Sequence, residues 1–149
     1  MITTAFAFAG RASYVIENPK GESVTVKLSR SKAGNVNPYT GQPYAETFFV
    51  SLRHNNAPWM FVGKLDAQRR KILATSKVEA YCDLVEAYWQ SPAGARAIAI
   101  AQWSLDLIHA RATVPAGYRL AHTGRCGKCG KLLRDAESIA LGLGPVCRG

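Results

Sequence analysis

Acidic side chains are scarce in this chain of 149 residues. Ten aspartates and glutamates stand against nineteen lysines and arginines, so the formal net charge at neutral pH is +9. This excess favours a polyanionic partner, although charge alone does not separate DNA, RNA and a membrane surface. The hydrophobic fraction of 48% is that of an ordinary globular domain, which excludes the disordered and fibrous classes.

Long hydrophobic runs are also lacking. The most apolar stretch, Ala97 to Ala101, is preceded by Arg96 and is far shorter than the roughly 20 residues that a membrane-spanning helix needs. The first ten residues are apolar but have no cationic flank, so no secretion signal is predicted. We therefore expect no membrane association and a cytoplasmic location.

Cysteine is scarce and unevenly placed, since three of the four cysteines fall within the last 24 residues. This number and spacing exclude a disulfide-rich secreted scaffold. Common catalytic motifs are missing as well: there is no Gly-x-x-x-x-Gly-Lys-Ser/Thr phosphate loop, no His-Glu-x-x-His and no nucleophile with an evident base. The sequence predicts no enzymatic activity.

An alternation of apolar and polar residues runs from Thr3 to about Thr75 and predicts short β-strands. The alternating apolar residues are Phe6 and Phe8; Tyr14 and Ile16; Val24, Val26 and Leu28; Phe48, Val50 and Leu52; Met60 and Val62. Turn-forming residues separate the runs, as in Asn18–Gly21 and Asn55–Pro58. The pattern predicts an antiparallel β-meander over residues 1–75.

From Ser76 the apolar period becomes 3.6, which predicts two helices over residues 76–111. Ser76 and Glu79 have the spacing of a capping box, and Ser91 followed by Pro92 provides the start of the second helix. Strands followed by helices predict an α+β domain over residues 1–117.

The last 32 residues, 118–149, have too few large apolar side chains for a core of their own. They contain the knuckle Cys126-Gly-Lys-Cys129, and Cys147 follows after a gap of seventeen residues. Glycine after each cysteine of the knuckle allows a tight turn in which both thiolates meet one tetrahedral ion. We predict one structural Zn²⁺ in this segment, which we call the C-terminal module.

A fourth ligand is needed for a closed zinc site, and His122 is the best candidate, four residues before Cys126 on an expected strand over 118–122. Among the rivals, His109 is expected on an outer helix face and His54 beside a turn, while Cys82 falls within an apolar stripe, where cysteine behaves as a small hydrophobe. A disulfide remains an alternative. A redox Cys-x-x-Cys opens a helix in a βαβ unit, and no such unit is predicted.

The remainder of the module has the pattern of a small treble-clef or ribbon-like zinc fold. Residues 131–134 can form the second arm of a hairpin, and Asp135 then caps a short helix over 136–141 that Gly142 ends. Gly144 and Pro145 return the chain towards Cys147.

The run from His122 to Cys147 resembles an uncharacterised zinc-finger-like module found at the C-terminus of many bacteriophage and some bacterial proteins. The matching residues are His122, Gly124, Arg125, Cys126, Gly127, Cys129, Gly130, Leu133, Ser138, Ile139, Gly142, Gly144, Pro145 and Cys147. The strands at 49–51 and 61–63 are similar, more loosely, to the domain that precedes this module in small phage proteins. The resemblance implies metal binding and a phage origin, with the host cytoplasm as location.

Basic residues are dense in the module, which has six of them against two acidic ones. The six are Arg119, Arg125, Lys128, Lys131, Arg134 and Arg148. Lysine and arginine donate strongly to phosphate oxygens, so these residues are the predicted nucleic-acid contacts. We expect a phage-type accessory protein that binds DNA or RNA through this basic structural-zinc module. The alternative is a protein-interaction module that docks on a host enzyme or a viral assembly, with zinc purely structural.

Overall fold

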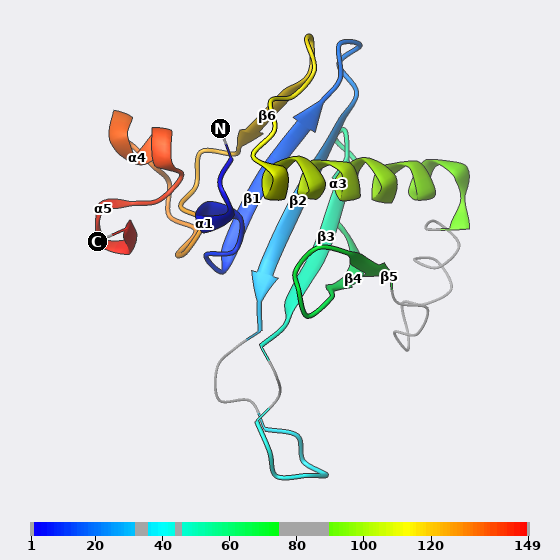
Figure 1. Ribbon diagram of the computed structural model, residues 1–149, viewed down its shortest axis with the longest axis vertical. Coiled ribbons are helices and arrows are strands. Elements are labelled where there is room, and N and C mark those ends of the chain that lie inside the picture. The colour runs from blue at the N-terminus through cyan, green and yellow to red at the C-terminus, as the bar shows by residue number, and fades with distance from the viewer. Residues whose placement is uncertain (1, 32–35, 44–45, 75–89, 149) are drawn as a thin grey trace.

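The computed structural model describes residues 2–31, 36–43, 46–74 and 90–148. Within these ranges the chain forms one six-stranded antiparallel sheet, and helix α3 lies across one face of it (Figure 1). Helices α4 and α5, near the C-terminus, lie to one side of the sheet beside the short helix α1. The predicted α+β class is confirmed.

The strands follow the predicted meander closely. Their bounds are β1 Arg11–Glu17, β2 Ser23–Arg30, β3 Phe48–His54, β4 Met60–Leu65, β5 Ile72–Ala74 and β6 Arg119–His122. Their order in the sheet is β5-β4-β3-β2-β1-β6, so β6 pairs with β1 at the far edge. Strand β5 was not predicted, because three residues are too few to show a period of two.

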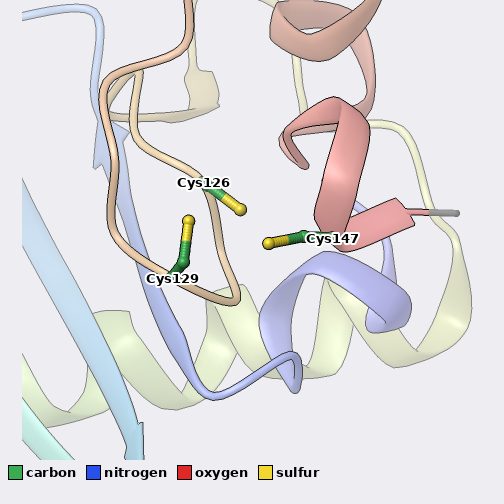
Figure 2. Close-up of side chains that lie close together, drawn as sticks. All are labelled: Cys126, Cys129 and Cys147. Carbon is green, nitrogen blue, oxygen red and sulfur yellow. The ribbon is translucent and has the colours of Figure 1, made fainter.

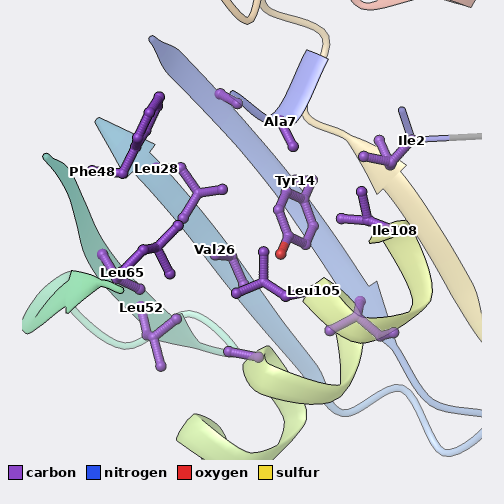
Figure 3. Close-up of a cluster of buried hydrophobic side chains, with 14 of the residues drawn as sticks. Ile2, Ala7, Tyr14, Val26, Leu28, Phe48, Leu52, Leu65, Leu105 and Ile108 are labelled. Carbon is purple, nitrogen blue, oxygen red and sulfur yellow. The ribbon is translucent and has the colours of Figure 1, made fainter. Parts of the chain in front are cut away.

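The alternation seen in the sequence is the alternation of burial. In β1 the side chains of Ala12, Tyr14 and Ile16 are buried, whereas the residues between them are partly exposed. Figure 3 shows Tyr14 beside Leu105 and Ile108 of α3, together with buried residues of β2 and β3. One face of the sheet therefore forms the core, as strict alternation requires.

Helix α3 spans Pro92–Ala110 and confirms the second predicted helix. The Ser91 hydroxyl accepts a hydrogen bond from the Gly94 N–H at 3.2 Å, and Pro92 occupies the first turn, where its missing N–H costs nothing. The residues of its buried apolar face are Ala97, Ala101, Leu105 and Ile108. The first predicted helix, over 76–90, lies outside the described residues except for Gln90.

The prediction of a strand at Phe6 and Phe8 is wrong, because helix α1 spans Thr4–Ala7. The Thr3 hydroxyl accepts a hydrogen bond from the Phe6 N–H at 3.1 Å and caps this single turn. Phe6, Ala7 and Phe8 are all buried, so the apparent alternation does not divide an inner face from an outer one. Alanine between two phenylalanines is apolar enough to be buried with them.

The C-terminal module begins with β6 as an edge strand of the same sheet and continues into α4 Ala136–Leu141 and α5 Pro145–Arg148. The domain boundary at residue 118 stays a prediction. No described helix has both the length and the apolar character required to cross a membrane.

A buried hydrogen bond joins β1 to α3. The hydroxyl oxygens of Tyr14 and Ser104 are 2.9 Å apart, and both residues are fully buried. Ser104 donates to the Ala101 carbonyl at 2.6 Å, so Tyr14 donates to Ser104. Burial raises the pKa of Tyr14, which keeps this hydroxyl protonated.

We expect Ser104→Ala to destabilise the protein by about 1–3 kcal/mol, because it leaves the Tyr14 hydroxyl buried without a partner. Tyr14→Phe should reduce the free energy of unfolding by less, since Ser104 keeps its hydrogen bond to the Ala101 carbonyl. The loss of stability in the double variant should be smaller than the sum of the losses in the two single variants. Urea unfolding of the three variants measures these differences, and a larger loss for Tyr14→Phe than for Ser104→Ala would contradict the assigned donor.

Candidate metal centre

Three cysteines converge in the C-terminal module (Figure 2). The sulfur atoms of Cys126, Cys129 and Cys147 all lie within 4.8 Å of one another. Two of them come from the knuckle that follows β6, and the third comes from α5. The arrangement could hold a metal ion.

The knuckle is the tip of a small hairpin. The Cys126 N–H donates to the Lys131 carbonyl at 2.8 Å, and the Gly130 N–H donates back to the Cys126 carbonyl at 2.9 Å. An antiparallel bridge between Arg125 and Leu132 continues the pairing, as predicted for the second arm. Gly130 has a φ of +78°, which lies in the left-handed region that favours glycine.

Two short helices close the gap between the knuckle and Cys147. The Asp135 carboxylate accepts a hydrogen bond from the Ser138 N–H at 3.0 Å and caps α4, while Gly142 ends it with a φ of +72°. Both caps are as predicted. Hydrogen bonds from Ser138 lower the pKa of Asp135. Cys147 then lies on α5, where the sequence indicated only a return of the chain.

The three thiols differ in acidity because their surroundings differ. Burial raises the pKa of Cys126, but N–H groups directed at its sulfur, including that of Gly144 at 3.4 Å, outweigh burial and lower the pKa to about 6. The thiol of Cys147 is hydrogen-bonded to the sulfurs of Cys129 and Cys126, which raises the pKa of Cys147 to about 11. A bound divalent cation would stabilise all three as thiolates.

The ring of Phe6 anchors the module to α1. Phe6 is buried, and a Cβ added at Gly127 or at Gly142 would lie only 2.6 Å from its Cδ2 atom. The Gly127 N–H donates to the Gly142 carbonyl at 2.9 Å, and the Gly127 carbonyl accepts from the Arg11 N–H at 2.6 Å. Two glycines are therefore required for packing, a role that a sequence pattern alone does not reveal.

His122 lies apart from this group. Its Nδ1 accepts a hydrogen bond from the Gly124 N–H at 2.9 Å, so the proton of the neutral ring is on Nε2, which donates to the Ile139 carbonyl. The Phe6 ring centroid is 5.6 Å away. Among the described residues, the ligand atoms that gather within 4.8 Å belong to the three cysteines alone, so the structure does not bring His122 to them.

The other two histidines have partners elsewhere. The Nε2 atom of His54 lies 3.6 Å from the Oε2 atom of Glu22. The Nε2 atom of His109 lies 2.7 Å from the Arg69 carbonyl oxygen, and its ring stacks on Phe8. The remaining cysteine, Cys82, lies outside the described residues.

Similarity to known proteins was found only within the C-terminal module. A model of a family of unknown function, DUF6011, matches residues 121–149. No curated protein and no solved structure matches the chain. The matched segment contains all three converging cysteines, so the similarity covers the candidate centre and not the sheet.

The six basic residues of the module fall into two groups. Arg119 pairs with Glu17 at 3.7 Å, and Arg125 donates to the Gly130 carbonyl at 3.2 Å. Arg148 donates to the Ser138 hydroxyl at 2.8 Å and also to the Leu143 carbonyl and the Glu137 carboxylate. The side chains of Lys128, Lys131 and Arg134 are exposed. Arg119 and Arg125 are exposed as well, whereas the Arg148 side chain is only 21% exposed. The second group is distinguished by having neither an ion pair nor a side-chain hydrogen bond among the described residues.

We expect Cys126→Ser to abolish metal retention and to expose the amides of residues 123–148 to rapid exchange, while β2 and β3 stay protected. Hydrogen exchange read by mass spectrometry, together with metal content, measures both effects. Cys82→Ser is the matched control and should keep its metal. Full protection of the tail in Cys126→Ser would contradict a metal-dependent module.

Gly127→Ala should destabilise the module by about 1–3 kcal/mol, because the new methyl group meets both the ring and the carbonyl of Phe6. Gly144→Ala is the matched control, since the nearest atom to its Cβ is a Leu133 methyl at 4.0 Å. Thermal unfolding of the metal-loaded proteins compares the two. Equal losses of thermal stability in the two variants would show that contact with Phe6 does not exclude a side chain at position 127.

Proposed function

We propose that the C-terminal module of a phage-type accessory protein is a treble-clef or ribbon-like fold stabilised by one structural Zn²⁺. The buried side chains of residues 118–148 are only Cys126, Leu133 and Ser138, which is too little apolar surface to stabilise a separate core. Three thiolates form a soft donor set of the kind that binds zinc strongly. Metal binding then supplies the folding free energy that burial does not.

The module binds nucleic acid in this proposal, and the exposed cations of the hairpin are the observation that carries it. Lys128, Lys131 and Arg134 fall within seven positions around the knuckle, and no ion pair in the described part of the chain engages them. Arg11 extends this group onto β1, since its Cδ lies 3.8 Å from a Cβ built at Gly130. Such a group suits contacts to phosphate oxygens, which position a protein without reading base sequence.

We expect the affinity of the zinc-loaded protein for a short DNA duplex to fall steeply with salt, by about 0.9 decade per phosphate contact for each decade of salt. Replacing Lys128, Lys131 and Arg134 together by glutamine should lower that slope by about 0.9 for each phosphate that the protein no longer neutralises. Fluorescence anisotropy over a salt series measures both slopes.

The matched control removes three exposed lysines elsewhere: Lys20, Lys64 and Lys71. With glutamine at these three positions, the control has the same net charge as the variant that lacks Lys128, Lys131 and Arg134. A general effect of net charge would therefore change the salt dependence of both variants alike. Equal losses of affinity in the two variants, or no binding of DNA or RNA at low salt, would exclude the hairpin as a nucleic-acid surface.

A protein-interaction module is the second candidate, favoured by apolar side chains beside the centre. Leu132 is 58% exposed and Val146 91% exposed, and both line the same cavity, so they offer a partner a shared apolar surface. A protein partner should survive nuclease treatment and moderate salt, and its binding should weaken in Leu132→Ser. Loss of all binding after nuclease would favour the first candidate.

A further inference from the structure

A cavity adjoins the three cysteines. Its volume is about 420 Å³, which is the size of a small-molecule site, and all three cysteines line it. Its apolar lining residues include Leu132, Leu133, Pro145 and Val146. Lys131 and Arg134 also line it, so a cationic edge adjoins the apolar wall.

Three sulfurs on a tetrahedral ion leave one position, and the histidine and the carboxylate nearest to the cysteines already have hydrogen-bond partners. Both nitrogens of His122 are hydrogen-bonded to backbone groups, one of them on α4. The Asp135 carboxylate, which lines the cavity, caps α4 through the Ser138 N–H. Recruiting His122 to a metal would break one of the two bonds that link the loop at Gly124 to α4, and Asp135 already caps that helix.

We propose that the fourth position of the metal faces this cavity and takes a small thiolate with an apolar body from outside the chain. A soft donor matches the three thiolates already present, the apolar wall suits the body of the ligand, and Lys131 and Arg134 favour an anion. In the exchange the thiol proton goes to solvent, a sulfur–metal bond forms and the previous solvent ligand leaves. The charge of the centre changes from −1 to −2, next to two cations.

His122 is then a positioning residue. Its ring links the loop at Gly124 to the carbonyl of Ile139 on α4 and packs near Phe6, so it orients the hairpin relative to the helix that precedes Cys147. The inference rests on the metal assignment proposed above and is independent of nucleic-acid binding.

X-ray absorption of the full-length zinc protein tests the proposal by counting sulfur ligands. We expect three sulfurs at about 2.3 Å and one lighter donor at about 2.0 Å, and four sulfurs after addition of benzyl mercaptan. Benzyl alcohol, which has the same body without the thiol, should change nothing. The visible spectrum of the cobalt form should titrate in parallel, with 2-mercaptoethanol binding about tenfold more weakly than benzyl mercaptan because it buries less apolar surface.

Variants distinguish a centre of three cysteines and one external ligand from centres in which His122 or Cys82 is the fourth ligand. Cys82→Ser should keep the same starting spectrum and the same response to benzyl mercaptan. His122→Asn should bind the metal more weakly, because the loop at Gly124 loses its link to α4, but it should still gain a fourth sulfur ligand on addition of benzyl mercaptan. Leu132→Ser should weaken benzyl mercaptan binding while leaving 2-mercaptoethanol binding unchanged. These results would support an open fourth position on the cavity.

Three results would overturn the proposal: imidazole scattering in the X-ray absorption of the zinc protein, a fourth sulfur that disappears in Cys82→Ser, or no response to benzyl mercaptan. In each case the metal is still bound, so the zinc assignment survives. A protein that retains no metal at all would instead refute the zinc assignment and this proposal together.

Discussion

Strand β1 is paired along both edges, and the position of the cysteine cluster depends on this double pairing. β2 lies along one edge and β6 along the other. The bonding continues past β6, because the Ser13 carbonyl accepts from the Thr123 N–H at 3.1 Å and the Arg11 N–H donates to the Gly127 carbonyl at 2.6 Å. The knuckle therefore takes its orientation from the main sheet, and Phe6 of α1 packs against it from the interior. A module with three buried side chains could not fix that orientation by its own packing.

The cysteine cluster has an electrostatic conflict of its own. Backbone N–H groups lower the pKa of Cys126 and so favour its thiolate. The neighbouring sulfurs of Cys129 and Cys126 raise the pKa of Cys147 and so favour its protonated thiol. Sulfurs so close together cannot all be ionised without a compensating cation. A divalent metal removes this conflict and joins the hairpin to α5, so the same ion neutralises the charge and closes the chain. This is the physical basis for treating metal binding and folding of the module as one process.

Net charge overstates the surface available to a polyanion. Of the six cations in the module, Arg119, Arg125 and Arg148 have partners within the chain. Arg148 in particular joins α5 to α4, and so supports the position of Cys147. Of the exposed remainder, Lys131 and Arg134 line an apolar cavity, so the same small surface combines positive charge, apolar side chains and sulfur ligands. Those chemistries recognise different partners, which is why nucleic-acid binding and ligand binding at the metal are separate proposals.

The sequence by itself determined the elements with a clear local signal. Alternation marked β1 to β4, Ser91 and Pro92 marked the start of α3, and Asp135 and Gly142 marked the ends of α4. The Cys-x-x-Cys spacing identified the knuckle, because two ligands on one tight turn are a local property. The tertiary structure alone decided the helical conformation at Phe6, the pairing of β6 with β1 and the partners of the arginines. It also placed His122 against α4 instead of beside the sulfurs. These features depend on contacts between residues distant in sequence, and no local period or spacing encodes which distant group a side chain will meet.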